Sequence, residues 1–163
     1  MTALVLLGAS GLDVEEDTPS EVPFWLPVLR WPLVGNLVLQ LPLRGVVRER
    51  VAPAYYDPAA LTEERLDEWT LRLTAAGSLD AYLARVNRPP EDSRREKMKA
   101  IRAPTLVVTG DSDRMVPPAV ARLYHELIPE SELVVLEKTG HVPQEERPER
   151  VVAEISRWAD AHP

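Results

Sequence analysis

The sequence predicts an α/β protein built on a parallel sheet of about three strands. Three short apolar runs that lead to a glycine have the composition of strands buried on both faces: ALVLLGAS at residues 3–10, TLVVTG at 105–110 and ELVVLEKTG at 132–140. Helical patterns with one apolar face follow the last two runs, at 117–129 and 147–161. Strand, helix, strand and helix at this spacing are typical of parallel strands joined by helical crossovers.

The chain divides by pattern into three segments. Residues 1–23 hold the first strand and an acidic, proline-broken connection, residues 24–90 are mainly helical in pattern, and residues 91–163 form the C-terminal α/β segment. In the middle segment, Asp57 before Pro58 predicts the start of a helix. The apolar positions expected to share a helix face are Leu66, Trp69 and Leu73 and, after a stop at Gly77 and a cap at Ser78, Leu79, Tyr82, Leu83 and Val86.

Composition limits the classes of partner. With 163 residues and 45% hydrophobic content, the chain has the size of one ordinary domain. The net charge of −7 argues against a nucleic-acid partner, which needs clustered Lys and Arg. Because the chain has no cysteine, disulfides, zinc–thiolate sites and cysteine nucleophiles are excluded. Separately, we expect neither a metal nor a cofactor.

The apolar segment 24–43 raises the question of a membrane span. Prolines and polar side chains interrupt it, so we expect short helices that cover an apolar cavity, with a membrane-surface role as the alternative. The interrupting residues are Pro27, Arg30, Pro32, Asn36, Gln40 and Pro42. No Lys or Arg precedes Arg30, so the basic start of a secretory signal is missing and a cytoplasmic location is expected.

An acid and a histidine follow the last two predicted strands. Asp113 lies shortly after the strand TLVVTG, and His141 directly follows the strand that ends at Gly140. Because parallel strands end at one edge of the sheet, these side chains can meet, and a carboxylate on imidazole Nδ1 suits the histidine for acyl transfer. Taken singly, an Asp after a strand, as Asp113 is, is most often a turn residue or a helix cap. We expect His125 and His162 to be solvated surface residues.

Residues 103–158 resemble the C-terminal third of an α/β-hydrolase-fold enzyme. The segments that carry the resemblance are TLVVTGDSDRMVP and ELVVLEKTGHVP. In that family the first segment carries the catalytic acid three residues after the glycine, and the second carries the catalytic base after the glycine. The resemblance therefore implies Asp113 as the acid and His141 as the base, with Asp111 as the weaker candidate for the acid.

The middle segment resembles, less specifically, the helical cap that many of these enzymes insert between the sixth and seventh strands. The resemblance implies a small-molecule substrate bound against cap aromatics. The candidates are Trp25, Trp31, Tyr55, Tyr56 and Trp69. For each of them, core packing is the alternative, because aromatics at helical spacing usually serve burial.

Ser10, in the stretch LVLLGASGL, invites comparison with the G-x-S-x-G turn that presents a nucleophilic serine. Gly8 fits that pattern, but Leu12 stands where the second glycine belongs. The acidic, proline-cut sequence after Ser10 also lacks the apolar helix that should follow. The resemblance makes this stretch the sixth strand, whereas the nucleophile follows the fifth.

We therefore expect a C-terminal part of a hydrolase whose nucleophile, a Ser or an Asp, is missing from this chain. The edge of residues 3–10 would then be an exposed template for self-association or for a complementary strand. The alternatives are a non-catalytic binding or assembly module and a complete minimal hydrolase in which Ser10 acts.

Overall fold

The computed structural model describes residues 3–12, 44–78, 80, 81, 84 and 93–162. The chain forms two compact units. The core unit comprises residues 1–16, 53–60 and 91–163, and the helical unit comprises residues 17–52 and 61–90. Residues 53–60, which lie within the expected segment 24–90, belong to the core unit.

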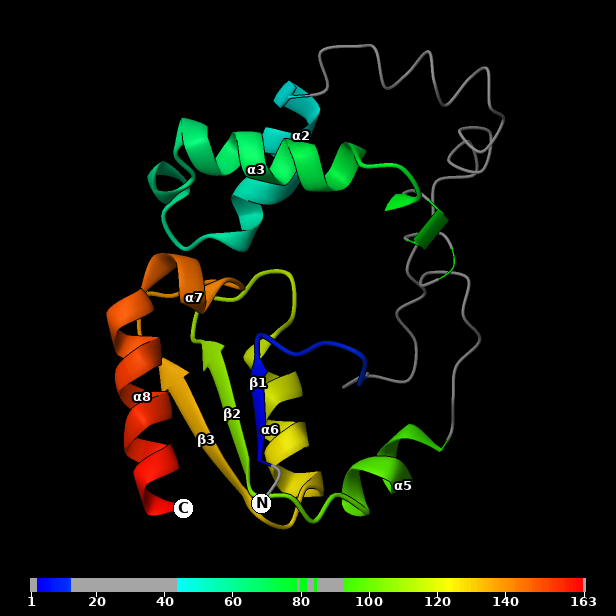
Figure 1. Cartoon of the computed structure of the whole chain (residues 1–163), viewed down its shortest axis with the longest axis vertical. Helices are drawn as coiled ribbons and strands as arrows, with labels where there is room; N and C mark the ends of the chain where they lie inside the picture. Colours follow the sequence, from blue (N-terminus) through cyan, green and yellow to red (C-terminus); the bar gives the residue numbers. More distant parts are fainter. Residues whose placement is uncertain (1–2, 13–43, 79, 82–83, 85–92, 163) are drawn as a thin grey trace. The chain divides into compact units, whose positions relative to one another are not determined.

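The core unit contains the predicted three-stranded parallel sheet (Figure 1). Its strands are β1 (Leu4–Leu7), β2 (Thr105–Gly110) and β3 (Ser131–Leu136), in the order β1-β2-β3. Leu4 pairs with Thr105, and Thr105 pairs with Ser131. Every residue of β2 is buried, which explains why the strand contains no charged residue and does not alternate between apolar and charged positions. The third strand ends at Leu136, earlier than expected, because the chain turns at Lys138, where φ is +50°.

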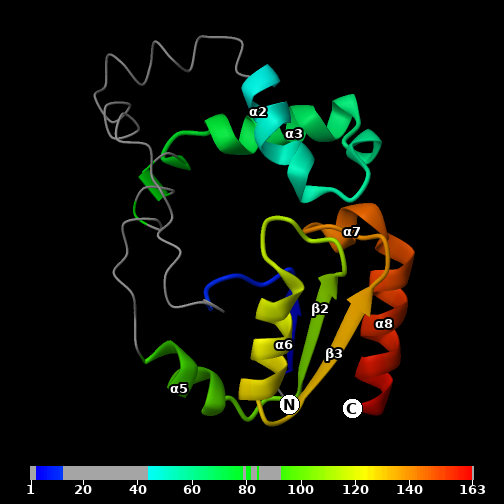
Figure 2. The same cartoon turned by 180° about the vertical axis from the view of Figure 1, so that it is seen from behind.

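Helices cover both faces of this sheet, as Figure 2 shows. On one face, α6 (Pro118–Leu127) packs Val120, Ala121 and Tyr124 against Val107. Met98 of α5 (Arg94–Lys99) packs against the same cluster. On the other face, α8 (Pro148–Ala161) packs its predicted apolar residues against the sheet. This second cluster contains Leu106, Val108, Leu136, Val151 and Trp158, with Ile155 packed against it.

Three short elements of the chain are single helical turns. Asp57 does cap a turn, since its Oδ1 accepts a hydrogen bond from Ala59 N at 2.9 Å. The turn is the single 3₁₀ turn η3 (Pro58–Ala60) and not the start of an α-helix. A similar turn, η2 (Ala52–Ala54), precedes it, and α7 (Pro143–Glu146) is one helical turn.

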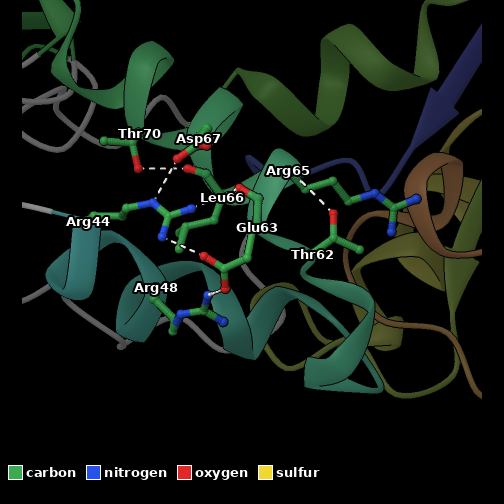
Figure 3. Close-up of polar contacts among 8 residues, drawn as sticks. All are labelled: Arg44, Arg48, Thr62, Glu63, Arg65, Leu66, Asp67 and Thr70. Carbon is green, nitrogen blue, oxygen red and sulfur yellow. Dashed lines mark hydrogen bonds and ion pairs between the residues drawn. The ribbon is translucent and has the colours of Figure 1, made fainter.

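In the helical unit, α2 (Arg44–Val51) pairs with α3 (Glu63–Thr74). Val47 and Val51 are buried on α2, and Leu66 is buried on α3. Ion pairs join the exposed sides of the same helices: Arg44 Nε lies 2.7 Å from Asp67 Oδ1, and both Arg44 and Arg48 pair with Glu63 (Figure 3). The hydrogen bond from Arg44 holds the pKa of the Glu63 carboxyl below its ordinary value.

The predicted face of α3 is only partly buried. Leu66 is buried and Trp69 is half-buried, but Leu73 is 48% exposed. The helix ends at Thr74, and Gly77 follows with a φ of +83°.

Ser78 is not a cap. It lies within the next helical turn, and its hydroxyl donates a hydrogen bond to Arg72 O at 2.8 Å. Several predicted positions lie outside the described residues: the segment 24–43 with Trp25 and Trp31, and the expected apolar positions Leu79, Tyr82, Leu83 and Val86. Among the helices that are described, none is long and apolar enough to cross a membrane.

Candidate functional site

The loops after β2 and β3 cross at close range. Asp111 N donates to Leu136 O at 2.9 Å, and Ser112 N donates to Thr139 O at 3.1 Å. A Cβ atom on Gly110 would lie 2.0 Å from Thr139 O, so only glycine fits at this crossing. The crossing places the loop that contains Asp113 beside the loop that contains His141.

Asp113 and His141 form a hydrogen-bonded pair at this edge of the sheet. Asp113 Oδ2 lies 2.8 Å from His141 Nδ1. The other carboxylate oxygen, Oδ1, accepts hydrogen bonds from Met115 N at 2.9 Å and from Val116 N at 2.8 Å. The Asp113 side chain is fully buried, whereas that of His141 is 24% exposed. A carboxylate held in this way orients the ring, fixes the proton on Nδ1 and leaves Nε2 to exchange protons with a substrate or nucleophile.

Residues from other parts of the chain contact the loop between β3 and α7, residues 137–142, which we call the histidine loop. His141 N donates to Ala54 O at 2.6 Å. Gly8, directly after β1, has a φ of +53°, and a Cβ there would lie 2.5 Å from His141 O and 3.3 Å from His141 Nδ1. Within the described part of the chain, Asp113 and Ala54 are the two hydrogen-bond partners of His141. The glycine that suggests a nucleophile turn in the sequence thus makes room for His141.

Asp111 has a different environment. It is exposed, and its Oδ1 accepts hydrogen bonds from Ser112 Oγ at 2.8 Å and from Thr139 N at 3.4 Å. The Ser112 hydroxyl is the main cause that holds the pKa of this carboxyl below its ordinary value. Of the two acids after β2, Asp113 is therefore the one that is bonded to the histidine.

Ser10 lies on the surface two residues beyond Gly8. Its carbonyl accepts a hydrogen bond from the Tyr124 hydroxyl at 2.9 Å, and Gly11 follows it with a φ of +115°. Residues 9–12 are not helical. Residues 11 and 12, the two described residues that directly follow Ser10, are therefore not the start of a helix that could stabilise an oxyanion.

The aromatic candidates that the structure describes differ in exposure. Tyr55 is completely buried, and its hydroxyl donates to the Glu145 carboxylate, which favours core packing. Tyr56 is 38% exposed, and its backbone N donates to Glu146 Oε2 at 2.7 Å. Trp69 belongs to the helical unit. Glu145 and Glu146, which contact Tyr55 and Tyr56, are not among the residues that the sequence predicts for the site.

The other two histidines serve local contacts. His125 is exposed, with Nδ1 3.0 Å from Ser131 Oγ. His162 stacks on Trp158 with ring centroids 4.8 Å apart. Within the ranges that the structure describes, no group of three or more Asp, Glu or His side chains is arranged to hold a metal ion.

A parallel sheet covered on both faces, with an acid and a histidine at the ends of neighbouring strands, is the arrangement of the α/β hydrolases. The sequence pattern described as "Alpha/beta hydrolase family" matches residues 2–154. The chain belongs to this family.

Individual relatives agree with this assignment. An uncharacterized hydrolase of Bacillus subtilis (strain 168), YugF, is 27% identical over 133 residues, which are 82% of this chain and 45% of that protein. Lipase 1 of Psychrobacter immobilis is 38% identical over 58 residues, which are 34% of this chain and 18% of that protein. The structure of a thermophilic esterase from Thermogutta terrifontis matches 98% of this chain and 56% of its own with a TM-score of 0.67 and 25% identity. The chain spans about half the length of YugF and of this esterase.

Proposed function

We propose that this chain supplies the acid and the base of an α/β-family hydrolase that cleaves a carboxylic ester or related bond in a small, largely apolar substrate. The observation that carries the proposal is the 2.8 Å contact between the buried Asp113 carboxylate and His141 Nδ1. The lipase and the esterase among the similar proteins support ester cleavage. The half-exposed Tyr56 is the described aromatic residue of the core unit that could contact such a substrate.

With a Ser nucleophile, His141 Nε2 takes the hydroxyl proton and returns it to the leaving group. With an Asp nucleophile, which attacks as the carboxylate, His141 Nε2 instead takes a proton from the water that hydrolyses the covalent intermediate. The Asp113 carboxylate keeps the other proton on Nδ1 and stabilises the imidazolium while it exists. Its three hydrogen bonds hold it in place throughout.

The nucleophile, in this proposal, is a Ser or an Asp that residues 1–163 do not provide. The exposed position of Ser10 and the lack of a helix in residues 9–12 support this part of the proposal.

A serine-directed probe tests the nucleophile assignment on the chain as it is. After incubation with a fluorophosphonate, intact-mass analysis is expected to show no adduct, and p-nitrophenyl esters are expected to be stable. An adduct mapped to Ser10, with ester turnover that Ser10→Ala and His141→Ala both abolish, would instead identify Ser10 as the nucleophile.

A chimera tests the acid–base pair. Residues 2–154, the range that matches the family pattern, replace the corresponding region of YugF, and the rest of YugF is expected to supply the nucleophile. His141→Ala should lower esterase kcat by about 10³-fold or more. His125→Ala is the matched control and should leave kcat unchanged. Equal activity of the two variants would contradict the proposal.

A second candidate function is a non-catalytic module that assembles through the edge of β1. Within the described ranges β1 pairs only with β2, and Val5 is 36% exposed. Such an edge can pair with another strand. Size-exclusion chromatography distinguishes the candidates, since concentration-dependent dimers that Val5→Lys dissociates would favour assembly.

A further inference from the structure

Glu146 bridges two backbone segments that are far apart in the sequence. Its Oε1 accepts a hydrogen bond from Gly140 N at 2.6 Å, and its Oε2 accepts one from Tyr56 N at 2.7 Å. Glu146 is only half-buried, so both contacts form at the rim of the core unit. A single carboxylate therefore joins the residue before His141 to the segment 53–60.

The turn of α7 brings the carboxylate back to this position. Val142 O accepts hydrogen bonds from Glu145 N at 2.9 Å and from Glu146 N at 3.1 Å. The side chain of Glu146 then reaches Gly140 N, and this hydrogen bond closes a loop of residues 140–146. His141 is the second residue of this loop.

Further contacts bind the same two segments together. Ala54 O accepts from His141 N at 2.6 Å, and the Tyr55 hydroxyl donates to the Glu145 carboxylate. The approach is close, because a Cβ on Gly140 would lie 2.3 Å from Ala54 O. Each of residues 54–56 thus has a partner in the histidine loop or in α7.

We propose that Glu146 is a positioning residue for His141. By accepting from Gly140 N and Tyr56 N at once, it fixes the backbone from which the imidazole reaches Asp113. The role requires a carboxylate, since both donors are N–H groups and an ionised carboxylate accepts at both oxygens. The catalytic meaning of this role rests on the proposed function, but the positioning itself does not.

Amide hydrogen exchange measured by NMR on the full chain tests the proposal without any enzymatic activity. In Glu146→Ala, exchange at Gly140 and Tyr56 is expected to be about tenfold faster or more, because each amide loses a charge-assisted hydrogen bond. The His141 Nδ1–H signal should broaden or vanish. Exchange at Val107, in the centre of β2, should not change.

Glu146→Gln gives a sharper readout and guards against a variant that fails to fold. Glutamine has one acceptor oxygen, so one of the two amides should stay protected while the other exchanges faster. Glu149→Gln is the matched control, because Glu149 is exposed in the first turn of α8. It should match the parent protein throughout.

Unchanged exchange at both amides in Glu146→Gln, or an unchanged His141 signal in a folded Glu146→Ala, would overturn the proposal. The hydrogen-exchange experiment does not depend on the chimera. If His141→Ala failed to lower kcat of the chimera, the proposed function would be refuted, but the exchange results would still test the positioning role of Glu146.

Discussion

Replacing Asp113 by asparagine is expected to leave the core unit folded and to lower kcat of the chimera by about 10⁴-fold. The asparagine oxygen can still accept from Met115 N and Val116 N, so the loop keeps its shape. Its NH₂ group, however, would face His141 Nδ1 and donate to it. The proton of a neutral ring would then move to Nε2, which could no longer accept the nucleophile's proton.

The measurement combines kinetics with NMR of the histidine ring. In the unmodified chain the Nδ1–H proton should give a downfield signal, and Asp113→Asn should remove that signal while the β2 amides keep their chemical shifts. Asp111→Asn is the matched control, because that carboxylate is bonded to Ser112 and Thr139. A loss of kcat in Asp111→Asn as large as in Asp113→Asn would contradict the assignment of Asp113.

Asp113→Ala separates the structural cost from the catalytic one. It leaves the Met115 and Val116 amides without this acceptor and the His141 ring without its Asp113 partner, at a cost of roughly 3–5 kcal/mol in the free energy of unfolding. Asparagine should cost much less. Urea unfolding of the isolated chain gives both values.

Gly8→Ala is expected to cost about 3 kcal/mol or more and to displace His141, because two penalties act at one position. The φ of +53° strains any residue with a Cβ, and that Cβ would overlap His141 O at 2.5 Å. The overlapped atom is backbone, so relief requires movement of the histidine loop. The His141 Nδ1–H signal should therefore change together with the free energy of unfolding.

Substitutions at two other glycines of the core unit measure the strain of a positive φ and the steric overlap separately. Gly11 has a φ of +115° but only an ordinary contact, 3.6 Å from the Tyr124 hydroxyl, so Gly11→Ala should cost about 1–3 kcal/mol and leave the His141 signal unchanged. Gly110→Ala has the steric overlap with Thr139 O and should move the crossing of the loops. If Gly8→Ala costs no more than Gly11→Ala, the close packing of Gly8 on His141 is refuted.

The sequence predicts best those elements whose pattern of apolar residues is set by burial alone. The strand TLVVTG reads as buried on both faces because it is the central strand, and α8 shows its buried face through Val151, Ile155 and Trp158. The predictions for Ser78 and for the end of the third strand were wrong, because a hydroxyl donating to Arg72 and a turn at Lys138 leave little trace in periodicity.

For the site, the sequence was enough to predict the acid and the histidine, but not the residues that surround them. The positions of Asp113 and His141 after neighbouring strands were enough to expect a contact between them. Glu145 and Glu146 could not be found in this way, since the backbone amide of Tyr56 and the hydroxyl of Tyr55 that they accept from lie 90 residues earlier in the chain.

By itself, the sequence determined the α/β class, the order of the strands along the chain and the acid–histidine pair, because periodicity and strand-end position are local properties. Only the tertiary structure decided what Gly8, Gly110 and Gly140 are for. Each lies where another backbone segment passes too close for a Cβ, and such a crossing depends on residues distant in the chain. The stretch LVLLGASGL therefore contributes strand β1 and, at Gly8, a position without a Cβ against which His141 packs.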